Sequence, residues 1–169
     1  MMKPVVLLLL LVTFTTGLQA VEFKPYTGTI KHPQLSLKGM DRKNYHLSDY
    51  KGQVVLVLFW ATYCSPWLAE LPSMNRLQER LQGKPFKILA IDMTETEAEA
   101  KTFMQSVNPE FSILLDSDGS TIQQWKVLAA PTRFIIAPNG EIKYTLYGAI
   151  EWDSDQMEKQ LQTLMPKRD

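Results

Sequence analysis

The stretch VVLVLFWATYCSPWLAELP, residues 54–72, joins a strand to a helix through a single cysteine. Residues 54–59 are continuously apolar and rich in β-branched valine, which predicts a strand covered on both faces. Pro66 opens a segment with helical spacing that extends to Gln82, since proline is favoured in the first helical turn. We therefore expect Cys64 between the end of a buried strand and the start of a helix.

The rest of the chain alternates between strand-like and helix-like segments. Strands are expected at residues 34–38, 45–47, 54–59, 86–91, 132–137 and 141–147, and helices at residues 66–82, 94–107, 120–125 and 157–164. Strand–helix–strand units imply parallel pairing, whereas the first and last strand pairs have the pattern of antiparallel hairpins. The sequence therefore predicts an α/β fold with an N-terminal β-hairpin and a mixed central sheet flanked by helices on both faces.

Three local signals predict how individual elements begin, turn and bend. Thr94 with Glu97 fits a capping box at the start of the second helix. Asn139-Gly140, between the last two strands, favours a type I′ hairpin turn. Pro72 lies inside the first helix, where it removes a backbone hydrogen bond and is expected to bend the helix.

The amino end has the pattern of a secretory signal peptide. Lys3 precedes an apolar run at residues 5–12, and small and polar residues follow up to Ala20. The run is shorter than the roughly 20 apolar residues that span a bilayer, so cleavage near Ala20 is favoured over an uncleaved membrane anchor. The expected protein is exported to the periplasm with no stable membrane span in the mature chain, and its parts are a signal peptide, an N-terminal extension and one domain at residues 1–20, 21–33 and 34–166.

Composition excludes several classes of protein. Hydrophobic residues make up 45% of the chain, which supplies a core and excludes a disordered protein. Lys+Arg and Asp+Glu number 18 each, so no excess positive charge is available for binding nucleic acid. One cysteine rules out an internal disulfide or a thiolate metal cluster, and His32 and His46 lie in separate segments. We therefore expect no metal, no cofactor and no nucleic-acid partner.

The position of Cys64 suggests reactivity. A cysteine at a helix N-terminus faces unpaired N–H groups and the positive end of the helix dipole, and both favour the thiolate, which is the reactive form. The alternative is that Cys64 is a small buried hydrophobe, as most free cysteines are.

Glu70 lies on the apolar arc of the same helix. Burial disfavours the charged form of a carboxyl, so Glu70 could exchange a proton with the thiol at the helix start. The alternative is that Glu70 reaches solvent at the edge of the arc or simply bonds a nearby backbone N–H. The residues alone leave this alternative and the proton exchange equally open.

Residues 59–66, FWATYCSP, resemble the active-site segment of the TlpA/ResA branch of thioredoxin-like proteins. These are exported bacterial thiol–disulfide oxidoreductases, some of which reduce apocytochrome cysteines before haem attachment. The resemblance covers about residues 35–165, implies a thioredoxin-like fold, and includes Glu70-Leu71-Pro72, the Asp116…Gly119 turn, Val127, Ala130-Pro131-Thr132 and the Asn139-Gly140 hairpin.

The resemblance implies roles for several residues. Pro131 should be cis and lie against Cys64, with the Ala130 backbone offered to a substrate peptide, and Trp60 and Thr132 would complete the substrate-binding surface. Glu70 matches a buried acid of this branch. The implied partners are protein thiols or disulfides, such as a membrane thiol reductase or an apocytochrome.

One departure from the family pattern is large. The motif Cys-x-x-Cys here reads Cys64-Ser65-Pro66-Trp67. The second cysteine normally resolves the mixed disulfide that the first one forms, and Trp67 cannot do this. Trp67 either shields the sulfur, fills the place of the lost cysteine, or is simply core.

Three functions follow. The first is thiol–disulfide exchange through Cys64 alone, with the mixed disulfide resolved by a partner or a small thiol. The second is a redox-inactive binding module, in which Trp60, Trp67 and Pro131 grip an extended peptide. The third, a one-cysteine peroxidase, ranks last, because its Pro-x-x-x-Thr-x-x-Cys motif is absent: Val57 and Ala61 stand at the Pro and Thr positions.

Overall fold

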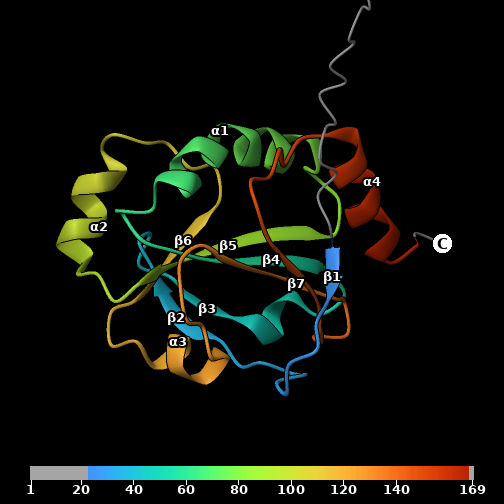
Figure 1. The fold of residues 1–169 in the computed structure, drawn as a ribbon, viewed down its shortest axis with the longest axis horizontal. Coiled ribbons are helices and arrows are strands. Elements are labelled where there is room, and N and C mark those ends of the chain that lie inside the picture. Colours follow the sequence, from blue (N-terminus) through green and yellow to red (C-terminus); the bar gives the residue numbers. More distant parts are fainter. Residues whose placement is uncertain (1–22, 168–169) are drawn as a thin grey trace, which may run out of the picture.

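The computed structural model describes residues 23–167. Within them, eight strands form one sheet in the order β1-β8-β7-β4-β5-β6-β2-β3 (Figure 1). The strands are β1 (Phe23–Pro25), β2 (Ser36–Gly39), β3 (Asn44–His46), β4 (Val54–Trp60), β5 (Phe86–Met93), β6 (Ser112–Asp116), β7 (Thr132–Ile136) and β8 (Ile142–Leu146). β4, β5 and β6 are parallel, and the other neighbouring pairs are antiparallel, so the predicted mixed sheet is confirmed.

Helices cover both faces of the sheet. They are α1 (Ser65–Arg80), α2 (Glu97–Met104), α3 (Ser120–Trp125) and α4 (Asp155–Leu164), with a short 3-10 helix at Leu47–Tyr50. α1 and α4 lie along one face and α3 along the other (Figure 1). β4 is buried along its whole length because it lies in the middle of this sandwich, as its unbroken apolar sequence predicts.

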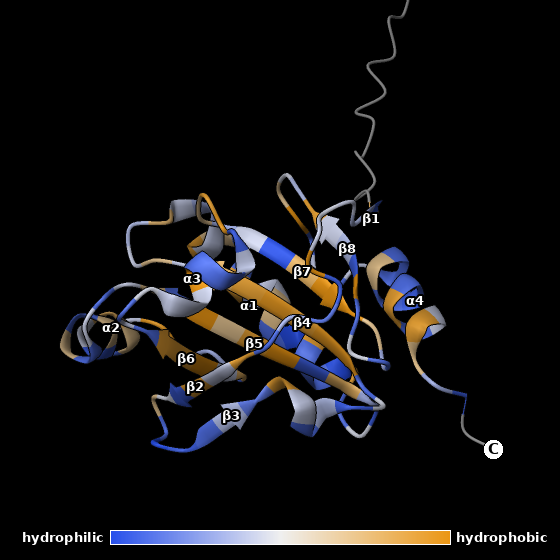
Figure 2. Cartoon of the chain, turned by 90° about the horizontal axis from the view of Figure 1, so that it is seen from below, coloured by the Kyte–Doolittle hydropathy of each residue, from blue (hydrophilic) through white to orange (hydrophobic). Residues whose placement is uncertain are grey.

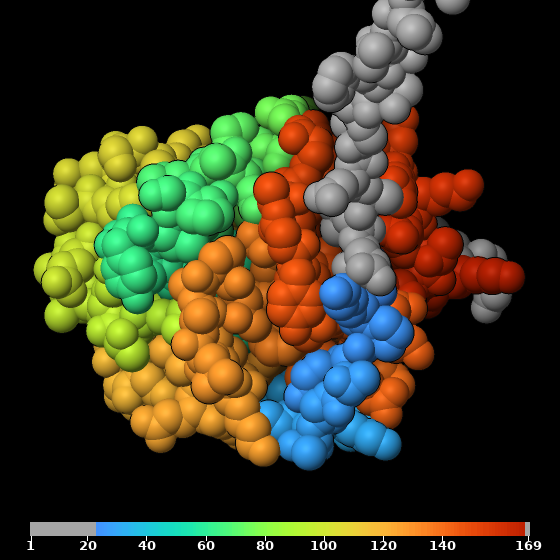
Figure 3. All heavy atoms as spheres, in the orientation of Figure 1, coloured from blue at the N-terminus to red at the C-terminus, as the bar shows by residue number. Residues whose placement is uncertain are grey.

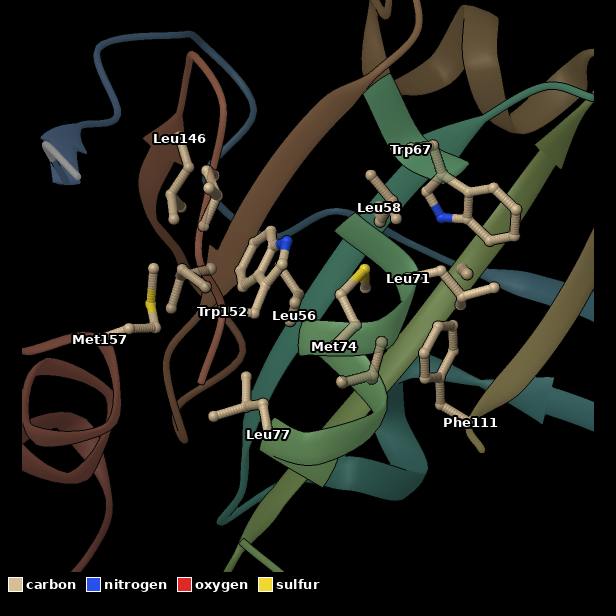
Figure 4. Close-up of a cluster of buried hydrophobic side chains, with 14 of the residues drawn as sticks. Leu56, Leu58, Trp67, Leu71, Met74, Leu77, Phe111, Leu146, Trp152 and Met157 are labelled. Atoms are coloured by element: carbon tan, nitrogen blue, oxygen red, sulfur yellow. The ribbon is translucent and has the colours of Figure 1, made fainter. Parts of the chain in front are cut away.

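The two faces of β4 supply two separate hydrophobic clusters. Leu56, Leu58 and Trp60 point to the α1 side, whereas Val55, Val57 and Phe59 point to the α3 side, because successive side chains of a strand alternate. Figure 2 shows the central strands as the most hydrophobic part of the molecule. In Figure 4, side chains from one face of α1 meet side chains of the sheet and of the segment leading into α4; those labelled include Trp67, Met74, Leu77, Trp152 and Met157.

The N-terminal extension takes part in the sheet, which the sequence did not indicate. β1 pairs antiparallel with β8, with Phe23 opposite Leu146. The predicted first hairpin is present, and Ser36 pairs with His46 across it. No helix among residues 23–167 is long and apolar enough to cross a membrane. The expected signal peptide lies outside the described residues.

Two predicted local motifs are wrong in detail. The capping box of α2 is formed by Thr96 and Glu99 instead of Thr94 and Glu97, so this helix begins two residues later than a cap at Thr94 would place it. The β7–β8 turn is not type I′, which needs a positive φ at both central residues. Only Gly140 adopts one there, at 84°, and its N–H donates to the Ala137 carbonyl oxygen at 2.8 Å.

Candidate functional site

Cys64 caps the N-terminus of α1, at the place that the sequence predicts. Its backbone N–H donates to the Ala61 carbonyl oxygen at 2.9 Å, and its carbonyl oxygen accepts the Trp67 N–H at 3.1 Å. These bonds define a tight turn, residues 61–64, which we call the Cys64 turn. Pro66 lies in the first turn of α1, and the side chains of Ser65 and Pro66 are exposed, whereas Cys64 itself is only 5% exposed.

Trp67 belongs to the core. It is fully buried and stacks on Trp60, with ring centroids 4.1 Å apart and planes inclined by 13°. Phe103 of α2 completes the aromatic cluster, at 5.5 Å from Trp60 and 5.7 Å from Trp67. An indole therefore occupies the position of the family's second cysteine. Because both tryptophans are inaccessible, the expectation that Trp60 and Trp67 grip a peptide at the surface is wrong.

The loop that precedes β7 lies beside the Cys64 turn. Thr132 pairs with Phe59, so the residues before β7 meet the residues that follow β4. Figure 3 shows these two segments, orange and teal, in contact on one face of the molecule. The Ala130–Pro131 peptide bond is cis, both residues are half-buried, and the Thr132 hydroxyl donates to the Ala129 carbonyl oxygen at 2.6 Å.

Exposed apolar side chains surround this loop and the Cys64 turn. Tyr63 is 78% exposed and Leu128 96% exposed, and Tyr147 is exposed as well. A cavity of about 560 Å³ opens beside Thr62 and Tyr63, and one of about 580 Å³ includes Leu128 and Tyr147 among its lining residues. These side chains, unlike the tryptophans, are accessible to solvent.

Glu70 is buried, as its place on the apolar arc predicts, and it is fully engaged. Its two carboxylate oxygens accept from Nη2 of Arg133 at 2.7 and 2.8 Å. The Trp152 indole N–H donates at 2.9 Å and the Ile150 backbone N–H at 3.3 Å. Both charged side chains are almost inaccessible, at 5% for Glu70 and 2% for Arg133.

Arg133 is the residue at this site that the sequence analysis missed. It also donates to the Gly148 carbonyl oxygen at 3.3 Å, and its guanidinium lies 5.9 Å from the ring of Trp152. The available signal was a lone arginine in the otherwise apolar strand β7, because a charge in a buried strand requires a buried partner. The pair ties α1 to β7 and to residues 148–152, and none of the donors to Glu70 comes from the Cys64 turn.

A second buried carboxyl, Asp92, lies at the end of β5, opposite Trp60. The pKa of Asp92 is raised to about 8, mainly by burial and also by the neighbouring acid Glu95. Burial thus favours the protonated form of Asp92. Among the described residues, no group of three or more histidine, cysteine or acidic side chains is arranged to hold a metal ion.

A mixed sheet with a cysteine at a strand-to-helix junction, facing a cis-proline loop, defines a thioredoxin-like protein. The model of the family described as "AhpC/TSA family" matches residues 30–145, and the chain belongs to this family. The resemblance to the TlpA/ResA branch is confirmed by its relatives.

Two similar proteins are named "Thiol-disulfide oxidoreductase ResA". The protein of Bacillus thuringiensis subsp. konkukian is 31% identical over 134 residues, covering 79% of this chain and 76% of the relative. The protein of Geobacillus thermodenitrificans is 28% identical over 168 residues, covering 98% and 95%. Among solved structures, the exposed lipoprotein thioredoxin of Streptococcus pneumoniae superposes with a TM-score of 0.69 at 29% identity, covering 78% of this chain and 99% of that one.

Proposed function

We propose that this protein acts in thiol–disulfide exchange and that Cys64 is its only reactive group. The observation that carries the proposal is the placement of Cys64 at the N-terminus of α1 beside the cis-Pro131 loop. Cys64 therefore stands at the positive end of the α1 dipole, a setting in which reactive cysteines are found. The names of the ResA relatives support the same chemistry.

The reaction needs two partners in turn. The Cys64 thiolate attacks one sulfur of a partner disulfide, a new S–S bond forms as the old one breaks, and the displaced sulfur leaves as a thiolate that takes up a proton. Because Trp67 replaces the family's second cysteine, a thiolate from another protein or a small thiol then attacks the mixed disulfide. That second step releases the Cys64 thiolate and leaves the first partner joined to the second.

The surroundings of Cys64 favour an extended peptide as the partner. The thiol is 5% exposed, so a partner must approach it through the surface formed by Tyr63, Leu128 and the residues 130–132. The Ala130 backbone would offer hydrogen bonds to the peptide, Pro131 would lie against its sulfur, and Thr132 would hold the loop through its bond to Ala129. Ser65 and Pro66, which follow Cys64 at the start of α1, are exposed as well.

Glu70 contributes in a different way from the proton exchange that its position first suggests. Its oxygens accept hydrogen bonds from Arg133, Trp152 and Ile150, so it serves as a fixed anion that holds α1 against β7. Glu70 is therefore proposed as a positioning residue that orients the helix on which Cys64 stands.

The setting we propose is the periplasm, reached after cleavage near Ala20. The signal-peptide pattern supports export, and the Streptococcus pneumoniae relative is described as an exposed lipoprotein. Protein thiols or disulfides are the expected partners, with a membrane thiol reductase or an apocytochrome as the candidates that the family suggests.

Trapping in cells tests this function. Cells that express the full chain are quenched with acid, free thiols are blocked, and whatever is disulfide-linked to Cys64 is identified by mass spectrometry. We expect a protein or small thiol attached to Cys64, released by reductant and absent from the Cys64→Ser variant. A free thiol under both oxidising and reducing growth would overturn thiol exchange and favour a redox-inactive module that binds partners through Tyr63 and Leu128.

A further inference from the structure

The ends of β4 and β5 lie side by side, and each strand leads into a short loop that is held by hydrogen bonds. Asp92, near the end of β5, pairs with Trp60 at the end of β4 and is completely buried. After β5 the chain turns at Thr94, which has a φ of 64°, and the Glu95 N–H donates to Oδ1 of Asp92 at 3.3 Å. The Ser117 hydroxyl fixes the Glu95 carbonyl oxygen from the other side, at 2.9 Å.

Both oxygens of the Glu95 carboxylate accept hydrogen bonds from a single residue of the Cys64 turn. Its Oε2 accepts the Thr62 backbone N–H at 2.8 Å, and its Oε1 accepts the Thr62 hydroxyl at 2.5 Å. Thr62 lies two residues before Cys64, inside the turn that the Cys64–Ala61 hydrogen bond closes. Two charge-assisted bonds to one residue fix both its backbone and its side chain. Glu95 therefore grips the turn that presents the thiol.

Asp92 in turn holds Glu95. The charged groups that act on Asp92 are Glu95 and, on α2, Glu99, and both are acidic. The adjacent strand β6 adds Asp116, whose oxygens accept N–H groups of Thr121 and Ile122 in α3. Oδ1 of Asp92 accepts the Glu95 N–H, and its completely buried Oδ2 has no hydrogen-bond partner. A carboxyl buried among like charges, with no donor on that oxygen, favours its protonated form.

We propose that Asp92 holds a proton beside the Glu95 carboxylate and that the two acids together position the Cys64 turn, with Glu95 holding Thr62 and Asp92 holding Glu95. The inference rests on the proposed function only in taking Cys64 as the reactive group. It concerns how the thiol is presented and is independent of which partner reacts with it.

The pair has two states with different consequences for the thiol. When Asp92 is protonated, Glu95 carries the only negative charge of the pair and stays on Thr62. When Asp92 ionises, near the raised pKa of about 8, its completely buried carboxylate lies beside the half-buried Glu95 carboxylate, and the two repel. Glu95 then moves away from Asp92, the grip on Thr62 weakens, and the Cys64 sulfur becomes more accessible.

The test separates thiol accessibility from thiol ionisation. Cys64 of the full chain is alkylated with iodoacetamide from about pH 6 to about pH 9.5, and thiolate absorbance in the same buffers gives the ionised fraction. Dividing the rate by that fraction gives the reactivity of the thiolate itself. We expect this quotient to rise several-fold around the pKa of Asp92 in the natural protein and to stay flat, at its low-pH value, in Asp92→Asn.

Two further variants bracket the effect. Thr62→Val removes the hydroxyl that Glu95 binds, so its quotient should already be high at about pH 6. Thr102→Val is the matched control, because the Thr102 hydroxyl lies at the same cavity but donates to Ala98 within α2. Its quotient should rise with pH as in the natural protein.

The proposal is overturned if the natural protein gives a flat quotient, or if Asp92→Asn gives the same rise. Carbon-13 NMR of the Asp92 carboxyl supplies a second measurement that needs no variant to fold: titration near the ordinary value of 3.8 would also overturn it. Alkylation requires no physiological partner. A pH-dependent quotient in a protein that never forms mixed disulfides would therefore refute the proposed function alone. A flat quotient in a protein that does form mixed disulfides would refute only the role of the Asp92–Glu95 pair.

Discussion

Glu70 and Asp92 are two buried acids on the same side of the sheet, and the fold accommodates them in opposite ways. Glu70 faces a guanidinium, an indole N–H and a backbone N–H, all of which donate hydrogen bonds to a carboxylate. Asp92 faces another acid. Equal burial therefore leaves one acid with its charge and the other with its proton, because the neighbours decide which form is less costly.

The difference separates two tasks near the thiol. The Glu70–Arg133 pair joins α1 to β7 through a buried ion pair in which one guanidinium nitrogen donates to both carboxylate oxygens. The Asp92–Glu95 pair holds the Cys64 turn with a bond that depends on one proton. A rigid support for the helix and an adjustable support for the turn are thus built from the same residue type.

Removing the cation from the first pair should produce the largest loss of stability. Arg133→Met keeps most of the side-chain volume but leaves Glu70 as a buried, uncompensated charge. We expect a loss of about 3–5 kcal/mol in the free energy of unfolding, measured by urea denaturation at neutral pH. The double variant Glu70→Gln/Arg133→Met should lose less than Arg133→Met alone. A loss below about 1 kcal/mol in Arg133→Met would show that the pair does not hold α1.

Removing the titrating group from the second pair should change how stability depends on pH. The pKa of Asp92 is raised from 3.8 to about 8 by folding, so the folded state keeps a proton that the unfolded state has released. Stability of the natural protein therefore falls as pH rises between these two values, by up to about 1.4 kcal/mol per pH unit, and this contribution levels off above the higher one.

Asp92→Asn lacks that slope, so its stability relative to the natural protein should increase steadily from about pH 4 to about pH 8. Urea denaturation at several pH values measures the difference, in which the titration of all other groups cancels. Parallel stability curves for the two proteins would contradict a proton held on Asp92.

Glu70→Gln tests the first pair with a smaller expected loss of stability than Arg133→Met. The amide oxygen can still accept from Arg133 and Trp152, so we expect a loss of roughly 1–3 kcal/mol in the free energy of unfolding. The pH profile of Cys64 alkylation should keep its shape, because Glu70 acts as a fixed anion. A displaced profile would instead restore the proton exchange between Glu70 and Cys64 that the sequence first suggests.

Breaking an exposed ion pair should give the smallest loss of stability in this series. Arg76 bonds Asp153 through Nε at 2.5 Å, and its side chain is 51% exposed. Arg76→Gln should give the smallest loss of the free energy of unfolding among these variants, and the loss should shrink further at high salt because solvent ions screen the pair. A larger, salt-independent loss would mean that contacts between α1 and the segment leading into α4 matter beyond their charge.

Features set by local spacing could be predicted from the sequence. The apolar run of β4, the proline at the start of α1 and the position of Glu70 on its arc placed Cys64 and Glu70 correctly, since each depends on neighbours within a few residues. The bond between Arg133 and Glu70 joins residues 63 positions apart, and that between Thr62 and Glu95 joins residues 33 apart. Periodicity shows which face a side chain occupies but not which residue lies opposite it.

The errors have the same origin at shorter range. Two threonines, at positions 94 and 96, each have an acid three residues later, and only the three-dimensional course of the chain after β5 decides which one caps α2. Pro138 presets a negative φ at the first central position of the turn that the Gly140–Ala137 hydrogen bond closes, so the turn is centred on Pro138-Asn139 instead of Asn139-Gly140. Trp60 was expected at the surface because the motif lies near the thiol. The motif does not reveal that the Trp67 indole stacks on Trp60 and buries it.

That stacked pair of indoles also bears on how the site can change over generations. Replacing Trp67 by cysteine would recreate the family motif in one substitution, but it would empty most of a fully buried indole's volume beside Trp60. A void of that size costs about 3 kcal/mol or more, a large part of the stability of an ordinary domain. Packing therefore opposes the return of a second cysteine at position 67 unless Trp60 or Phe103 changes as well to refill the space.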